Sequence, residues 1–363
     1  MDNITKIVLT GGPCAGKTTA LVRIIEHFTG LGYQVFTLPE TPTMFTQAGI
    51  NFLTKNRQLH YEAEKALLRI QLQIEDRFQE MATKCDKPVL IVCDRGTMDI
   101  SCYLSEEAWE AIMIETGVNT IGLRDSRYDA VLHLVTAANG AEEFYTTSNN
   151  SARTETPQQA RWLDRAVINA WTGHPHLRII NNTVDFEEKI RRVIAEISRI
   201  IGAPQPVDAE RKYAVEVIGE IPGAIENEIT QTYLLSEPDE EIRLRKRGSQ
   251  GNFVYFQTIK KPAGTPDERI ETERQISPRQ YIMLLQQADP NRKPIHKIRK
   301  NFVWEKQYFE LDTYLQPELG ISILEIDGVQ DHNAIKFPPF LRVIKDITGD
   351  FDYTNYKLSV KRD

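Results

Sequence analysis

The chain has 363 residues, more than one ordinary hydrophobic core holds, so we expect two domains. The formal net charge of −7 argues against nucleic acid as the main partner, and no apolar stretch approaches the roughly 20 residues that a membrane-spanning helix needs. The sequence enters a strand-like run almost at once and its four cysteines match no zinc-binding spacing, so we expect a reduced, cytoplasmic protein without a signal peptide.

Short apolar runs alternate with helical patterns from about residue 4 to residue 201. This alternation is typical of βαβ units. It predicts an α/β domain over residues 1–201, with a parallel sheet covered by helices on both faces. The predicted strands are Ile4–Thr10, Val35–Leu38, Val89–Cys93, Ala130–Val135 and Leu177–Ile180, and the clearest predicted helices cover 61–83, 158–171 and 186–201.

A phosphate-binding pattern, G-x-x-x-x-G-K-[ST], stands between the first predicted strand and a helical stretch. Its glycines let the backbone curl around a phosphate with N–H groups pointing inward. The lysine, Lys17, would contact the β- and γ-phosphates, and the Thr18 hydroxyl would reach Mg²⁺. The alternative, a glycine-rich turn that matches by chance, does not explain why strand, loop and helix fall in register. The pattern predicts binding of ATP or GTP by Gly11, Gly12, Pro13, Cys14, Ala15, Gly16, Lys17, Thr18 and Thr19.

Four further residues are candidates for a phosphoryl-transfer site, which depends mainly on positioning and charge neutralisation. Asp94 ends an apolar strand and is expected to hold Mg²⁺; a helix cap is the alternative. Asp94 and Arg95 resemble the Asp-Arg dipeptide of nucleoside and nucleotide kinases, and Glu40 resembles the acid that these kinases place beside the phosphoryl acceptor. A solvated loop acid is the alternative for Glu40. Arg153 lies in a polar stretch over 138–155 that has the composition of a mobile lid. We expect catalytic roles for Lys17, Glu40, Asp94, Arg95 and Arg153.

Several motifs in residues 1–201 resemble one family. These are GGPCAGKTT, CDRG, AANGAEEFYTTSNNSARTETPQQARWLDRAV and AWTGHPHLRIINN. Together they look like the AAA domain shared by the nicotinamide-riboside kinase module of NadR and the TRPL translocation-defect proteins. The last two motifs resemble the translocation-defect branch more. The resemblance implies a nucleotide-binding domain that acts as a kinase or as a regulatory switch, and no guanine signature selects GTP over ATP.

A proline-containing linker is predicted over 202–206, and from residue 207 the periodicity changes from helical to two. A helical insert over 278–288 and a short helix over 340–347 are also predicted. We count eight strand-like segments: about 208–216, 227–235, 241–247, 252–260, 267–276, 293–300, 305–315 and 320–327. Eight mostly antiparallel strands suggest a closed barrel, because closure removes the edge strands. The second domain is thus predicted to be α+β, built on an eight-stranded antiparallel tunnel barrel over 207–363.

Charged residues occupy alternate positions of nearly all these strands, which places them on one wall. The eight acids are Asp208, Glu210, Glu271, Glu273, Glu310, Asp312, Glu325 and Asp327, and the six bases are Lys212, Arg243, Arg245, Lys260, Lys297 and Arg299. A solvated sheet face is the plain alternative. We favour a charged lumen, because the opposite faces are apolar and must be covered. Such a lumen is stable only if it stays wet or holds ions, such as Mg²⁺ or Mn²⁺ on the acids and a polyphosphate on the bases.

The same residues resemble the CYTH, or triphosphate tunnel metalloenzyme, family over about 207–363. Asp208-x-Glu210-x-Lys212 matches the family's Glu-x-Glu-x-Lys signature with aspartate in the first place. The segments around 232–234, 242–245, 258–260, 295–299, 309–312 and 324–327 follow in the family's order. The resemblance implies that the bases bind triphosphate and the acids hold the metal that activates water. We expect a metal-dependent triphosphatase; the alternatives are adenylate cyclase chemistry, or a regulatory protein whose tunnel binds a phosphorylated ligand such as a phosphoinositide without turnover.

Overall fold

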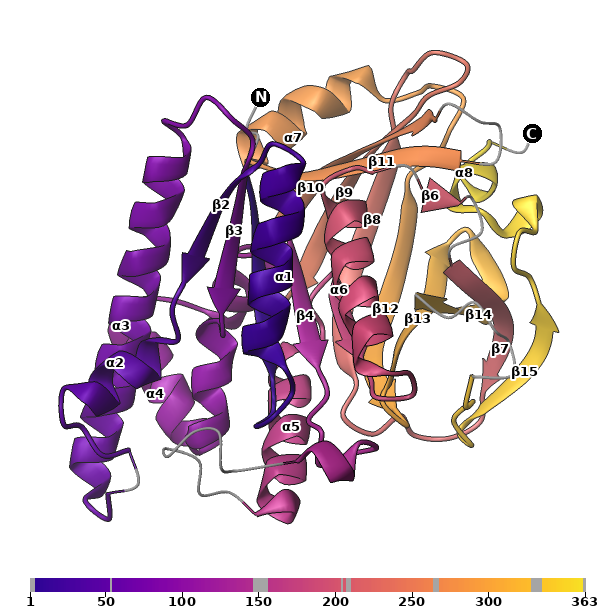
Figure 1. Ribbon diagram of the computed structural model, residues 1–363. Coiled ribbons are helices and arrows are strands. Elements are labelled where there is room, and N and C mark those ends of the chain that lie inside the picture. The colour runs from indigo at the N-terminus through magenta and orange to yellow at the C-terminus, as the bar shows by residue number, and fades with distance from the viewer. Residues whose placement is uncertain are drawn as a thin grey trace. The chain divides into compact units, whose positions relative to one another are not determined.

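The structure is a computed structural model that describes residues 4–52, 54–145, 156–203, 205–206, 210–263, 268–327 and 335–361. Arg153 and Asp208, two of the expected site residues, lie outside these ranges. The chain divides into two compact units, Met1–Glu196 and Ile197–Asp363 (Figure 1). Within the described ranges, no helix is long and apolar enough to cross a membrane.

The first unit contains a parallel five-stranded sheet in the order β2-β3-β1-β4-β5. Its strands are β1 (Ile4–Gly11), β2 (Gln34–Leu38), β3 (Val89–Asp94), β4 (Ala130–Leu134) and β5 (Leu177–Ile180). Its main helices are α1 (Lys17–Gly30), α2 (Thr41–Gln47), α3 (Arg57–Ala82), α4 (Glu106–Thr116), α5 (Pro157–Trp171) and α6 (Phe186–Ile200), which continues past Glu196. Strands β3 and β4 are buried almost throughout, as strands covered on both faces must be (Figure 1). The predicted α/β class is confirmed.

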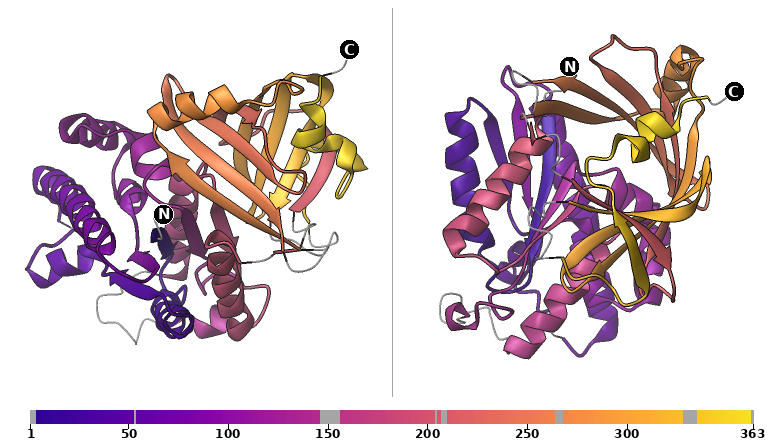
Figure 2. Two further views of the ribbon diagram at one scale, coloured as in Figure 1. Left: turned by 90° about the horizontal axis from the view of Figure 1, so that it is seen from above. Right: turned by 90° about the vertical axis from the view of Figure 1, so that its right-hand side faces the viewer.

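The second unit is built on a ten-stranded sheet in the order β15-β7-β14-β13-β12-β8-β9-β10-β11-β6. Eight of its strands are β7 (Glu210–Val217), β8 (Ile225–Tyr233), β9 (Glu241–Ser249), β10 (Asn252–Pro262), β11 (Glu268–Ile276), β12 (Ile295–Trp304), β13 (Gln307–Gln316) and β14 (Glu318–Asp327). Two strands join them: β6 (Gln205–Pro206), in the segment expected to be a linker, and β15 (Leu341–Asp346). The sheet is strongly curved (Figure 2). Among the described strands, no pairing joins its two ends into a closed barrel.

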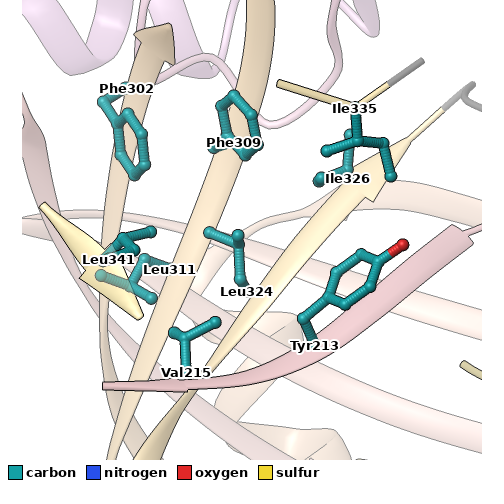
Figure 3. Close-up of a cluster of buried hydrophobic side chains, with 9 residues drawn as sticks. All are labelled: Tyr213, Val215, Phe302, Phe309, Leu311, Leu324, Ile326, Ile335 and Leu341. Atoms are coloured by element: carbon teal, nitrogen blue, oxygen red, sulfur yellow. The ribbon is translucent and has the colours of Figure 1, made fainter. Parts of the chain in front are cut away.

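The two faces of this sheet differ in chemistry. Tyr213, Leu311, Leu324 and Ile326 belong to an apolar cluster on one face, where Ile335 and other residues cover them (Figure 3). The positions between them carry charge and point the other way, because neighbours along a strand point to opposite faces. We call this the charged face. Its charged residues include Glu210, Lys212, Arg243, Arg245, Lys260, Glu271, Glu273, Lys297, Arg299, Glu310, Asp312, Glu325 and Asp327.

The helix predicted over 340–347 is wrong. This segment is strand β15, which pairs antiparallel with β7, with Leu341 opposite Val217 and Val343 opposite Val215. The β-branched Val343 and Ile344 suit an extended chain, and the pairing covers an edge that β7 would otherwise expose. The predicted insert over 278–288 is α7 (Pro278–Leu284) followed by a short 3-10 turn, Leu285–Gln287.

Candidate functional site

The phosphate-binding loop connects β1 to α1, and two of its glycines are required sterically. Gly11 has φ of 150°, and a Cβ there would lie 2.2 Å from the Leu134 carbonyl oxygen. Gly16, at φ of 89°, immediately precedes α1, and a Cβ there would lie 2.6 Å from the ring of Phe186. The loop follows the carboxyl end of β1, where the strand order reverses and ligands of open α/β sheets bind.

The outside of the loop is bonded to the surrounding scaffold. Three consecutive carbonyls accept: Thr136 Oγ1 donates to Pro13 O, Ala137 N donates to Cys14 O at 3.2 Å, and Lys189 Nζ donates to Ala15 O at 3.2 Å. In a planar trans peptide the N–H points away from the C=O of the same unit. The N–H groups that follow these carbonyls therefore point to the opposite side of the loop, which is the arrangement that an anion needs.

Asp164, on the buried face of α5, anchors the loop and was missed by the sequence analysis. Its Oδ1 accepts hydrogen bonds from the backbone N–H of Gly12 and of Thr136, both at 3.0 Å, and lies 3.1 Å from His133 Nε2. Burial opposes ionisation, but His133 and these N–H groups hold the pKa of Asp164 below its usual value. An acid on the apolar side of an amphipathic helix was the signal that could have identified it.

Asp94 and Lys17 lie close enough to influence each other's ionisation. Burial raises the pKa of Asp94, and Lys17 opposes that rise. Burial lowers the pKa of Lys17, with Arg95 adding to the effect and Asp94 opposing it. Asp94 Oδ1 is buried and has no hydrogen-bond partner within the described part of the chain. An unpartnered carboxylate oxygen beside the loop fits a hard cation such as Mg²⁺.

Glu40, Arg95 and Asp99 form a second charged group next to Lys17. Arg95 has φ of 70° and pairs with Glu40 and, at 3.4 Å, with Asp99. Burial opposes ionisation of Glu40, yet Arg95 and Lys17 lower its pKa to about 2. Asp99 also accepts from Gly96 N at 3.0 Å. The structure thus places Lys17, Glu40, Asp94 and Arg95, four of the residues proposed from the sequence as catalytic, near one another, and Asp99 joins them.

In the second unit, acids and bases of the charged face pair with one another. Arg299 contacts Asp312, Glu325 and Glu310. The nitrogen–oxygen distances to Glu325 are 2.6 Å from Arg299 and 3.0 Å from Lys212. The nitrogen–oxygen distances to Glu271 are 3.1 Å from Arg243 and 2.9 Å from Lys260. Lys297 also pairs with Asp312, and Arg245 pairs with Glu273.

Charges on the two halves of the sheet act on each other across the charged face. Lys212 is the main cause that lowers the pKa of Glu210 on β7, but Lys260 on β10 and Glu271 on β11 also influence it. Five strands separate β7 from β10 in the sheet order. Such influence requires the curved sheet to bring these strands opposite one another, so the charged face is the concave side.

The acids of the charged face have the oxygen donors that Mg²⁺ and Mn²⁺ take. Burial raises the pKa of Glu310, and Asp327, Glu325 and Asp312 raise it further, so these four carboxylates lie near one another. The donor chemistry therefore fits a divalent cation. In the described ranges, however, no three acids, histidines or cysteines are already placed so that they could hold a metal ion.

The two ends of the charged face differ in polarity. At one end Asn301 accepts from Asn227 at 3.1 Å and donates to Glu310 at 3.3 Å. These asparagines continue the period-two alternation past Arg299, a signal that the sequence analysis did not use. At the other end the same face becomes apolar. There Ala214, Tyr314 and Ile323 pack with the C-terminal segment, including Ile347, Tyr353, Tyr356 and Leu358.

These observations define a protein of two units: an α/β unit with a P-loop, then an antiparallel sheet with a concave charged face. A family model described as an AAA domain (AAA_28) matches residues 6–189, and the chain belongs to this family. A search of curated proteins found no match.

Solved structures match part of the chain. One, titled the inorganic triphosphatase NE1496, is 25% identical, covers 42% of this chain and 97% of its own, and has a TM-score of 0.31. Another structure of NE1496, titled a hypothetical protein, is 26% identical over the same shares, with a TM-score of 0.32. The PH1819 protein from Pyrococcus horikoshii OT3 is 20% identical, covers 34% of this chain and 80% of its own, and has a TM-score of 0.26.

Proposed function

We propose that the chain binds a Mg²⁺–nucleoside triphosphate in its first unit and hydrolyses a triphosphate or polyphosphate, with a divalent cation, in its second. The observation that carries the proposal for the second unit is the concave face on which bases and acids are already held as exchangeable ion pairs. A polyphosphate anion replaces the carboxylates on the bases, and the divalent cation binds the carboxylates that are released. Neither ion then leaves an uncompensated buried charge.

In the first unit we assign the phosphates to the loop residues Gly11–Thr19 and to Lys17. Thr18 and the unpartnered Asp94 would hold Mg²⁺. Glu40, kept ionised by Arg95 and Lys17, would face the phosphoryl acceptor or the attacking water. Arg153, from the segment expected to be a lid, would complete the site over the phosphates.

The experiment for the first unit is nucleotide titration of Lys17→Ala against the wild type, with ATP and with GTP. We expect affinity to fall about 10- to 150-fold, the value of one charge-assisted contact. Tripolyphosphate hydrolysis should be unchanged, because Lys17 belongs to the first unit. Equal nucleotide affinity in the two proteins would disprove the loop assignment.

For the second unit, we expect Glu210→Gln or Glu325→Gln to abolish metal-dependent phosphate release while polyphosphate still binds. The variant removes a metal ligand and lessens the repulsion of the anion. Arg245→Ala and Lys297→Ala should instead weaken binding, because they lose contacts to phosphate oxygens. Calorimetric titration with tripolyphosphate and phosphate-release assays with Mg²⁺ or Mn²⁺ check both.

The alternative activities are outcomes of the same assays. A wild type that binds tripolyphosphate or an inositol phosphate headgroup without releasing phosphate would be a regulatory receptor rather than a hydrolase. Release of pyrophosphate and a cyclic nucleotide from ATP would identify cyclase chemistry. A wild type that binds no polyphosphate, with or without metal, would overturn the assignment of the charged face.

A further inference from the structure

One cation at the charged face comes from outside the sheet. Arg199 lies in the last turn of α6 and belongs to the second unit, Ile197–Asp363. One of its terminal nitrogens lies 3.7 Å from Glu210 Oε1 and 3.8 Å from Asp327 Oδ1. Glu210 and Asp327 are direct register partners on β7 and β14, so the guanidinium bridges two neighbouring strands.

Glu210 and Asp327 lie at one end of the charged face. Glu210 begins β7 and Asp327 ends β14, whereas Ala214 and Ile323, farther along the same face, belong to the apolar closed end. Arg199 therefore contacts the acids at the end of the charged face that lies away from the apolar packing. Only 22% of its side chain is exposed, so this is a held position rather than a freely solvated one.

The strands also supply bases of their own near these acids. Lys212, the nearest, is shared between Glu325 at 3.0 Å and Glu210 at 3.3 Å. Arg199 thus adds positive charge where Glu210, Glu325 and Asp327 lie on neighbouring strands. The contacts of Arg199 at 3.7 and 3.8 Å exceed hydrogen-bond length, so they are ion pairs that another cation can replace without breaking a directed bond.

We propose that Arg199 is a tethered cation that occupies Glu210 and Asp327 in the metal-free protein and competes with the divalent cation for these acids. The inference rests on the proposed function in one respect, namely that these acids bind the metal. A carboxylate held by a guanidinium must exchange that partner before it coordinates a metal ion. Arg199 consequently sets the metal concentration at which the charged face fills.

The test is direct Mn²⁺ binding to the full chain, without nucleotide or polyphosphate, measured from the electron paramagnetic resonance signal of free Mn²⁺. We expect Arg199→Gln to bind Mn²⁺ about three- to tenfold more tightly than the wild type, as expected for the loss of one or two partly exposed ion pairs. Arg199→Lys, which keeps the charge, should bind nearly as the wild type does. Arg342→Gln is the matched control, because it removes the same charge from an exposed pair with Glu216.

Further variants locate the effect. In a Glu210→Gln background the gain from Arg199→Gln should be largely lost, whereas in an Asp94→Asn background it should persist. Equal or weaker Mn²⁺ binding by Arg199→Gln than by the wild type would overturn the role of Arg199 and leave the proposed hydrolase intact. Absence of Mn²⁺ binding in every variant, Asp94→Asn included, would instead remove the metal from the proposed function and the inference with it.

Discussion

Lys189, in the second turn of α6, is a buried lysine that supports the phosphate-binding loop. It is 3% exposed, and its Nζ donates to Ala15 O at 3.2 Å, to Val135 O at 2.8 Å and to Asn182 Oδ1 at 2.6 Å. Burial lowers the pKa of Lys189 to about 8, and Asp164 opposes the shift. The loop therefore depends on two buried charges, Lys189 and Asp164, that lie far from its motif in the sequence.

The lowered pKa gives Lys189 a measurable effect on stability. The pKa of Lys189 is about 8 in the folded chain, and its ordinary value is 10.5. Between pH 8 and pH 10.5, therefore, the unfolded chain holds a proton on this lysine that the folded chain does not. The contribution of Lys189 to the free energy of unfolding therefore rises with pH in this window, by up to about 1.4 kcal/mol per pH unit.

Lys189→Met should remove that rise, although it also loses the hydrogen bonds at every pH. Urea denaturation at pH 8, 9 and 10 measures the difference in slope between wild type and variant. Lys84→Met, at an exposed position, is the control and should follow the wild type. Parallel slopes for the wild type and Lys189→Met would show that Lys189 is not a buried, deprotonating group.

At the scale of elements, the strands of the first unit were predictable and β15 was not. A parallel strand that is covered on both faces is a continuous apolar run, and Val89–Asp94 fits this description. Strand β15 has one buried residue, Leu341, followed by five exposed ones, so its sequence contains neither a period of two nor a long apolar run. Its conformation is determined by pairing with β7, which local sequence does not encode.

Leu341 and Ile344 provide a test of the strand assignment. A helix would place them on one face, three residues apart, whereas the strand buries Leu341 at 6% exposure and leaves Ile344 at 55%. We expect Leu341→Ala to lower the free energy of unfolding by about 2–5 kcal/mol, and Ile344→Ala to change it by less than about 0.5 kcal/mol. Chemical denaturation of the two variants checks this; similar losses would favour the helix.

At the scale of the whole chain, length and the change of periodicity predicted two domains, and the alternation of charge along the strands predicted a wall of mixed charge. They could not predict which acid pairs with which base. That Arg299 contacts Asp312, Glu310 and Glu325 follows from the register of β12, β13 and β14. Asp164, Lys189 and Arg199 were missed for a related reason. Each reaches its site from a helix, where no local pattern marks the contact that it makes.

The apolar packing of Ala214, Tyr314 and Ile323 against the C-terminal segment ends the charged face at one side. A linear polyanion that lies along the charged face with one terminus toward this packing would place its last few phosphates against the bases. Cleavage under the proposed function would then shorten the chain from its end, one short product at a time.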